Sequence, residues 1–222
     1  MTNLAVFDLD NTLINTDSDH AWPQYLIKKG LVDAEETERQ NEKFYRDYQA
    51  GCLDIDAFLK FHLAPLARFS REELDEMHRE FTAEFIAPHI SDMARMLVEG
   101  HRVAGDELLV ISSTNEFIIT PICKIFGIDN VIGTQLETDA DGNYTGNYTG
   151  IPSLKEGKIT RLHQWLAARG KDLGDYGKVY FYSDSKNDLP LLRAVDEPVA
   201  VNPDADLLRE ALEKGWPVLN FK

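Results

Sequence analysis

The N-terminal apolar run, Leu4 to Phe7, ends in two closely spaced aspartates, Asp8 and Asp10. A short apolar run is typical of a buried strand, and polar residues at its carboxyl end would face a crevice at the edge of a sheet. Two carboxylates this close repel each other and raise one pKa unless a cation neutralises them. An aspartate beside a hard divalent ion can attack phosphorus and form an aspartyl-phosphate. This segment therefore predicts phosphoryl chemistry at the end of the first strand.

Size and charge limit what the chain can do. Its 222 residues suffice for one or two domains with a substantial core, and 43% hydrophobic with 27% charged residues is typical of a globular protein. The formal net charge of -15 argues against a nucleic-acid partner or an anionic membrane surface. An anionic substrate must therefore find local positive charge from a metal ion or a few placed cations. We expect a small-molecule partner, with the chain itself a monomer or a homodimer.

Two cysteines, Cys52 and Cys123, suggest reduced thiols rather than a disulfide scaffold. The first residues show no basic stretch before an apolar core, and Asp8 and Asp10 interrupt the one candidate for a signal peptide. No apolar run approaches the roughly 20 residues of a membrane helix. We therefore expect a cytoplasmic protein.

Residues 17–88 carry helical signals and almost no strand signals. Apolar residues recur at helical spacing from Trp22 onward and again over residues 55–63. Two residue pairs fit capping boxes that begin further helices, Asp33 with Glu36 and Ser70 with Glu73. We expect a small helical domain over residues 17–88, inserted into a core made of residues 1–16 and 89–222.

The remaining chain alternates between strand and helix patterns. The expected strands are residues 108–111, 131–132, 179–182 and 199–201. The expected helices are one that ends near Gly127, one over residues 156–168 and one over residues 189–194. Asp141 and Gly142 predict a hairpin turn between polar, threonine-rich arms. Strands that alternate with helices predict an α/β fold with a parallel sheet covered by helices on both faces.

Polar residues follow several of the expected strands or begin the next helix. These segments are Asp8 with Asp10, Ser112 with Ser113, Lys158, and the run from Ser183 to Asp188. The carboxyl ends of neighbouring parallel strands share one crevice, so these segments could converge. Each signal alone also has a structural explanation, because serine and aspartate cap helices and a lysine on a helix is usually solvated. In this order and at these strand ends, the four segments together are a specific signal of one shared site.

The pattern resembles the haloacid dehalogenase superfamily, in particular its phosphoserine-phosphatase-like branch, subfamily IB. The resemblance covers nearly the whole chain, and the motifs match at residues 8–12, Ser112, Lys158 and residues 184–188. Two details favour this branch: the helical domain lies between the first and second motifs, and a tight hairpin precedes the lysine. The resemblance implies a doubly wound, Rossmann-like parallel-sheet core with an inserted helical cap domain.

The resemblance also implies a Mg²⁺-dependent phosphatase. Asp8 would be the nucleophile that takes up the phosphoryl group, and Asp10 would be the general acid and then the general base. Mg²⁺ would be held by Asp8, the backbone carbonyl of Asp10 and Asp184, with Asp188 supporting the site.

The same resemblance places further residues around the phosphoryl group. Ser112, with Ser113 beside it, and Lys158 would bind the phosphoryl oxygens, and Lys158 would also offset the charge of Asp8. Asn187 would orient the loop of Asp184.

The cap should select the substrate. Asp17 falls where phosphoserine phosphatases place an acid that meets the substrate ammonium group, but residues 54–63 hold Lys60 and His62 instead of the arginine that binds the carboxylate. An amine-bearing alcohol phosphate without a carboxylate, such as histidinol phosphate, fits at least as well as phosphoserine. Alternatively, Asp17 only caps a helix and His62 lies on its surface. Trp22 could line the pocket or belong to the core, and so could Tyr25.

Other functions stay open from the residues alone. A phosphotransferase such as a phosphomutase would use the same nucleophile and the same acid. A phospho-accepting signalling receiver also uses Asp, Ser or Thr, and Lys, but places the accepting aspartate after a middle strand and has no inserted helical domain. A catalytically inactive binding module is the last alternative, because every catalytic residue type is retained.

Overall fold

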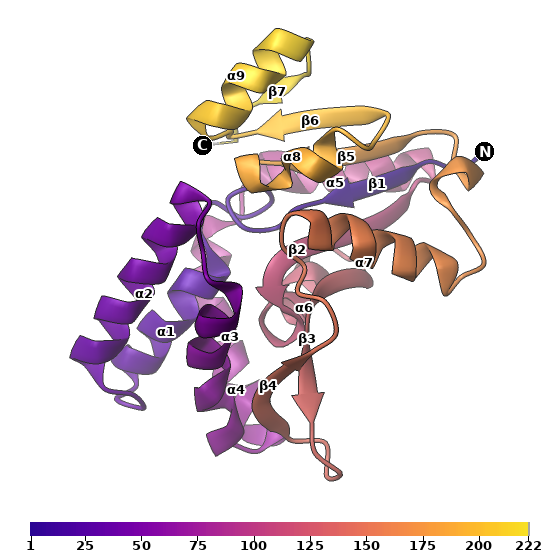
Figure 1. The fold of residues 1–222 in the computed structure, drawn as a ribbon. Coiled ribbons are helices and arrows are strands. Elements are labelled where there is room, and N and C mark those ends of the chain that lie inside the picture. Colours follow the sequence, from indigo (N-terminus) through magenta and orange to yellow (C-terminus); the bar gives the residue numbers. More distant parts are fainter. Residues whose placement is uncertain (222) are drawn as a thin grey trace.

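The computed structural model describes residues 1–221 as a seven-stranded sheet flanked by helices, with a further group of helices at one end (Figure 1). The strands are β1 (Leu4–Phe7), β2 (Glu107–Asn115), β3 (Asn130–Thr138), β4 (Tyr144–Thr149), β5 (Val179–Ser183), β6 (Glu197–Val201) and β7 (Val218–Leu219). The α-helices are α1 (Ser18–Lys28), α2 (Ala34–Ala50), α3 (Ile55–Leu63), α4 (Arg71–Phe81), α5 (Asp92–Ala104), α6 (Glu116–Ile125), α7 (Glu156–Ala167), α8 (Leu189–Leu192) and α9 (Ala205–Lys214).

The strand order across the sheet is β4-β3-β2-β1-β5-β6-β7. Every neighbouring pair is parallel except β3 and β4, which form the antiparallel hairpin that Asp141 and Gly142 predict. The predicted α/β fold with a doubly wound, mostly parallel sheet is confirmed.

The first strand, β1, lies in the middle of the sheet and is buried on both faces. Ala5 and Phe7 belong to a core shared with α1, α4, α5 and α6, whereas Leu4 and Val6 belong to a second core shared with α7, α8 and α9. A strand covered on both faces has no room for a charged side chain until it ends. This is why the first acid, Asp8, lies at the carboxyl edge of the sheet.

Helices α1 to α4 gather beyond that edge, next to the β3–β4 hairpin (Figure 1). The hydroxyl of Tyr148 on β4 donates to Oδ1 of Asp56 on α3 at 2.5 Å, so the hairpin and the helical group are in contact. All four helices fall within residues 17–88. The boundaries of the inserted domain itself stay a prediction.

The helical group is built around Trp22. Its ring packs edge-on against Phe81 of α4 and Phe117 of α6, with centroids 5.1 and 5.3 Å apart. Tyr25 is equally buried, and its hydroxyl donates to Glu80 at 2.8 Å. The core alternative is therefore correct for both residues.

Several element boundaries differ from the sequence expectation. β2 runs on past residue 111, the expected end of the strand, through Ser112 to Asn115, because Asn115 pairs with Thr134 of β3 after an irregular step in the register. β3 is longer than residues 131–132 because its second half pairs with β4. The helix expected over residues 189–194 is a single turn, α8.

Only one of the two expected capping boxes is complete. Ser70 and Glu73 form the complete reciprocal box at the start of α4. Asp33 does cap α2, accepting from the Glu36 amide at 2.8 Å, but the Glu36 carboxylate pairs with Arg39 instead of reaching back. Within residues 1–221, no helix combines the length and the apolar character that a membrane crossing requires.

Candidate active site

The chain turns sharply as soon as β1 ends. Asn11 adopts a left-handed backbone conformation with φ of 57°, which asparagine tolerates better than most residues, and the Leu13 amide donates to the carbonyl oxygen of Leu9. The turn brings Thr12 back toward the strand, so that its Oγ1 donates to Oδ2 of Asp8 at 3.1 Å. The local sequence therefore fixes the direction of the Asp8 carboxylate.

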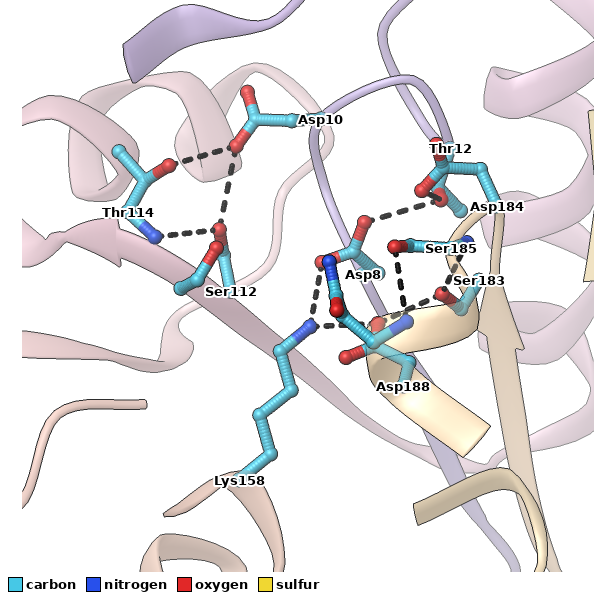
Figure 2. A network of polar contacts seen from close by, with 12 residues as sticks. Asp8, Asp10, Thr12, Ser112, Thr114, Lys158, Ser183, Asp184, Ser185 and Asp188 are labelled. Carbon is cyan, nitrogen blue, oxygen red and sulfur yellow. Dashed lines mark hydrogen bonds and ion pairs between the residues drawn. The ribbon is translucent and has the colours of Figure 1, made fainter. Parts of the chain in front are cut away.

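Lys158 reaches from α7 to the end of β1 (Figure 2). Its Nζ donates to Oδ1 of Asp8 at 2.8 Å and to Oδ2 of Asp188 at 2.7 Å. The hydroxyl of Ser183 also donates to Asp188, at 2.7 Å. Burial opposes the charge of Lys158, but Asp188 and Asp8 outweigh it and raise the pKa of the ammonium group. Lys158 is therefore a buried cation held between Asp8 at the end of β1 and Asp188 in the short turn that follows β5.

The loop after β5 carries Asp184 and Asn187. Oδ1 of Asp184 accepts a hydrogen bond from Thr12 Oγ1 at 3.4 Å. Burial, together with repulsion from the neighbouring carboxylates, raises the pKa of Asp184 well above its ordinary value. Nδ2 of Asn187 donates to the carbonyl oxygen of Tyr48 at 3.1 Å and so joins this loop to the end of α2. The role of Asn187 in orienting the loop stays a prediction.

Asp10 belongs to a second group of contacts, on the other side of Asp8 in Figure 2. Its Oδ1 accepts from the Ser18 amide at 2.7 Å, and its Oδ2 accepts from Thr114 Oγ1 at 2.9 Å and Ser112 Oγ at 3.3 Å. Burial is the main cause that raises the pKa of Asp10 to about 6, with repulsion from Asp17 adding to it and the Ser18 hydrogen bond opposing it. At neutral pH this carboxyl can therefore take up and release a proton.

The pKa of Asp8 rises further, to about 7. Burial is the largest cause, Lys158 opposes it, and repulsion from Asp188 and Asp10 adds to it. One lysine therefore does not neutralise the acids gathered at this edge of the sheet.

A pocket opens from these acids toward the helical group. Its polar lining is Asp8, Asp10, Asn11, Asp17, Asp19, His20, Asn41, His62, Ser113, Thr114 and Asp184. Its aromatic and aliphatic lining is Phe44, Tyr45, Tyr48, Leu53, Ile55, Phe58 and Leu154. Five of the described lining residues are aspartates, and none of them is a lysine or an arginine.

Of the predicted site residues, Asp8, Asp10, Asp17, Ser113 and Asp184 line this pocket, whereas Ser112, Lys158, Asn187 and Asp188 do not. Asp17 lines it and also caps α1, accepting from the His20 amide at 2.8 Å. Ser113 lines it as well, whereas the Ser112 side chain is buried and bonded to Asp10. The alternative that places His62 on the surface of its helix is wrong, because His62 is 4% exposed and lines the pocket.

The acids fit a divalent cation in charge and chemistry. Within residues 1–221, no three or more Cys, His, Asp or Glu side chains are arranged as a metal-binding group, so the four predicted acids do not form a cage of side chains. Mg²⁺ does not need such a cage, because it typically binds one or two carboxylates and keeps several waters. Asp8 and Asp184 offer two carboxylates, both approached by the same Thr12 hydroxyl, in a region of surplus negative charge.

Sequence reasoning missed three residues of the site. Thr114 and Ser18 hold the Asp10 carboxylate, and Asp19 lines the pocket beside Asp17. No sequence signal placed Asp19 beside Asp17, because side chains two residues apart on a helix do not share a face. Nothing in the sequence placed Thr114, because it lies in the part of β2 beyond residue 111, where the strand was expected to end.

Comparison with known proteins bears on this geometry. The family model for haloacid dehalogenase-like hydrolases matches residues 5–193. The chain belongs to this family. A histidinol-phosphatase of Neisseria meningitidis is 81% identical over 222 residues, covering 100% of both chains. This hydrolase is accordingly a phosphatase that acts on phosphate monoesters, which sets aside the receiver and the inactive binding module.

Solved structures agree on the fold of the hydrolase. A Bordetella pertussis protein of unknown function matches with a TM-score of 0.94 and 41% identity, and the match covers 100% of each chain. A phosphoserine phosphatase, solved as an analogue of its phospho-aspartyl intermediate, matches with a TM-score of 0.68 and 18% identity over 100% of this chain and 94% of that one. At that identity the second likeness supports the fold alone.

Proposed function

We propose that this hydrolase is a Mg²⁺-dependent phosphatase of a small amino-alcohol phosphate such as histidinol phosphate, and that it works through an aspartyl-phosphate on Asp8. The observation that carries the proposal is the position of Asp8. It lies at the end of the central strand, oriented by Thr12 and Lys158, in a pocket lined by four further aspartates. A carboxylate held in this way is suited to act as a nucleophile toward a phosphate ester.

In the first step, an oxygen of Asp8 would bond to phosphorus while the bond from phosphorus to the substrate oxygen breaks. Asp10 would give its proton to that leaving oxygen, and its raised pKa of about 6 suits this role. In the second step, Asp10 would take a proton from water, and the water oxygen would displace Asp8 from phosphorus. Inorganic phosphate leaves, and both aspartates return to their starting states.

Lys158 and Ser113 would contact the phosphoryl oxygens, whereas Ser112, expected in this role, is bonded to Asp10. Lys158 also holds Asp8 in place, because it bonds to Asp8 and Asp188 at once. A preorganised cation at this position stabilises the negative charge of the transferring group.

Asp8, Asp184 and the backbone carbonyl of Asp10 would hold Mg²⁺, with Asp188 supporting the site through Lys158. When bound, the ion would neutralise charge on the phosphoryl oxygens and on the carboxylates around them. Two observations support this assignment. Members of the family generally use Mg²⁺. The described pocket lining also has a surplus of acids and holds neither lysine nor arginine.

The part of the pocket lined by the helical group supports the substrate class. Aspartates and aromatic rings there suit a cationic or imidazole-bearing group better than a carboxylate. The histidinol-phosphatase at 81% identity supports the same class. The domain over residues 17–88 would cover this part of the pocket as a cap. A cytoplasmic location and a monomeric or homodimeric state stay predictions.

Release of inorganic phosphate from a panel of esters tests the proposal. We expect turnover of histidinol phosphate to exceed that of L-phosphoserine, to stop when EDTA is added and to return with excess Mg²⁺. Equal turnover of both esters would contradict the substrate class. Full activity in EDTA after extensive dialysis would contradict the metal requirement.

A further inference from the structure

Two buried side chains in the part of the pocket lined by the helical group carry polar atoms that have no hydrogen-bonding partner within residues 1–221. Asp19, in the first turn of α1, is 8% exposed, and its Oδ1 is unpartnered. His62, near the end of α3, is 4% exposed, and both of its ring nitrogens are unpartnered. Buried polar groups without partners are rare in native proteins because each one costs its desolvation energy. Both side chains line the pocket and therefore face the space that a ligand would fill.

The distance between the two groups suits a third polar atom. Nδ1 of His62 lies 3.8 Å from Oδ1 of Asp19, too far for a hydrogen bond between them. A ligand nitrogen can nevertheless lie within about 2.9 Å of both atoms, because a triangle with two such sides spans this gap. The arrangement is therefore completed by one nitrogen placed against both side chains.

The pocket lining favours a positively charged nitrogen at this position. The pocket lining includes five aspartates and neither lysine nor arginine among the described residues. Lys60 on the same helix as His62 is exposed and does not line this pocket. The site thus offers a substrate carboxylate no cationic partner, whereas it would attract a positively charged nitrogen.

Aromatic rings enclose the same position. Phe58 packs on the His62 ring with centroids 4.1 Å apart, and Phe44 meets that ring edge-on at 6.2 Å. Both phenylalanines also line the pocket. Aromatic faces attract cations and pack well against flat rings, so these two phenylalanines suit an ammonium group or an imidazole.

We propose that Asp19 and His62 form the subsite that binds the nitrogen-bearing end of the substrate and so determine its specificity. Asp19 accepts a charge-assisted hydrogen bond from that nitrogen, and His62 accepts through one ring nitrogen and donates through the other. This proposal rests on the proposed function, because it assumes that the phosphoryl end of the same substrate contacts Asp8.

The ionisation of both residues agrees with these roles. Burial lowers the pKa of His62 to about 3, so its ring is neutral and keeps one acceptor and one donor. Burial, with repulsion from Asp17 and Asp10, raises the pKa of Asp19 well above its ordinary value. A bound cation would oppose that rise by stabilising the carboxylate.

Four phosphate esters and three variants test the subsite. Histidinol phosphate carries an ammonium group and an imidazole, phosphoethanolamine carries only the ammonium, 2-(imidazol-4-yl)ethyl phosphate carries only the imidazole, and p-nitrophenyl phosphate carries neither. The variants are Asp19→Asn, His62→Gln and, as a matched control on the exposed side of α4, Asp75→Asn.

We expect Asp19→Asn to lower kcat/KM for histidinol phosphate about 10- to 100-fold, the size of a lost charge-assisted hydrogen bond, while p-nitrophenyl phosphate changes by less than about 2-fold. His62→Gln should act in the same direction, and Asp75→Asn should change neither ester. A parallel loss with phosphoethanolamine assigns the ammonium group to the subsite, and a parallel loss with the imidazolyl ester assigns the imidazole. Equal losses on p-nitrophenyl phosphate, or no loss on any ester, would overturn the proposal.

Binding of histidinol, which has no phosphate, separates this proposal from the proposed function. Calorimetry should detect histidinol binding to the parent protein and a weakening of about 10-fold or more in Asp19→Asn. If the parent binds histidinol but does not hydrolyse histidinol phosphate, the proposed function fails and the subsite stands. If the parent hydrolyses histidinol phosphate and both variants bind histidinol as tightly as the parent, the subsite fails alone. Should Asp19→Asn not fold, His62→Gln carries the same comparison.

Discussion

Nζ of Lys158 lies 2.8 Å from Oδ1 of Asp8, although 150 positions separate the two residues in the chain. The same nitrogen lies 2.7 Å from Asp188, and all three side chains are almost fully buried. Breaking a buried ion pair by removing one partner leaves an uncompensated charge. The lysine is therefore as important for the stability of this edge of the sheet as for chemistry.

We expect Lys158→Met to lower the free energy of unfolding by about 3–5 kcal/mol, because it leaves Asp8 and Asp188 buried without a cation. Urea denaturation at neutral pH measures this loss. As a control, Lys28→Met removes an exposed ion pair with Glu84 and should cost no more than about 1 kcal/mol. Equal losses in the two variants would contradict a structural role for the buried lysine.

Asp8→Asn should abolish phosphate release and leave the fold intact. The amide is nearly the same size as the carboxyl group but cannot attack phosphorus, and Lys158 keeps its second partner, Asp188. Phosphate release and circular dichroism, measured on the same preparation, check both parts. Normal turnover in this variant would show that another residue is the nucleophile.

Asp10→Asn should reduce kcat by about 10²- to 10⁴-fold, the usual contribution of a positioned general acid and base. Thr114→Val is the matched control, because it removes the 2.9 Å hydrogen bond to Asp10 while keeping the carboxyl group. It should lower kcat far less. A small loss in Asp10→Asn at every pH would rule out its role in proton transfer.

His62 should make the folded protein sensitive to acid. Its pKa is about 3 in the folded protein, mainly because of burial, whereas an exposed histidine in the unfolded chain titrates near about 6.5. Between these values the unfolded chain binds the extra proton, so stability rises with pH across the window and is lost as the pH falls.

Replacing the histidine isolates that contribution. The parent should lose about 2 kcal/mol more than His62→Gln when the pH drops from about 7.5 to about 5. Urea denaturation at the two pH values measures the difference, and His163→Gln at an exposed position of α7 serves as control. The same pH dependence in parent and His62→Gln would mean that His62 takes up its proton in the folded state.

Much of the site could be predicted from sequence because parallel strands present their carboxyl ends at one edge. Asp8 ends β1 and Asp184 directly follows β5, and these strands are neighbours in the sheet. Lys158 lies in the first turn of α7 and reaches the same edge. Local chemistry was equally informative where a few residues decide the structure, as in the Ser70 capping box.

The sequence was less informative wherever a residue depends on distant segments. His62 has the same helical spacing whether it faces solvent or a pocket, and its burial depends on Phe44 of α2 and on Asp19 of α1. Thr114 lies beyond the expected strand over residues 108–111, because pairing with β3, with Asn115 opposite Thr134, prolongs the strand. Such pairings across the chain leave no periodic pattern in the local sequence.

The central place of β1 has a consequence for how the enzyme is made. A ribosome releases this strand before its neighbours β2 and β5, which start only at Glu107 and Val179. Until those segments emerge, the apolar residues from Leu4 to Phe7 have no sheet to join, and the nascent chain must keep them from aggregating. Contacts between residues that are far apart in the sequence also slow folding. A polypeptide truncated before Val179 would lack β5, the second neighbour of β1 in the sheet. It would therefore have no working active site.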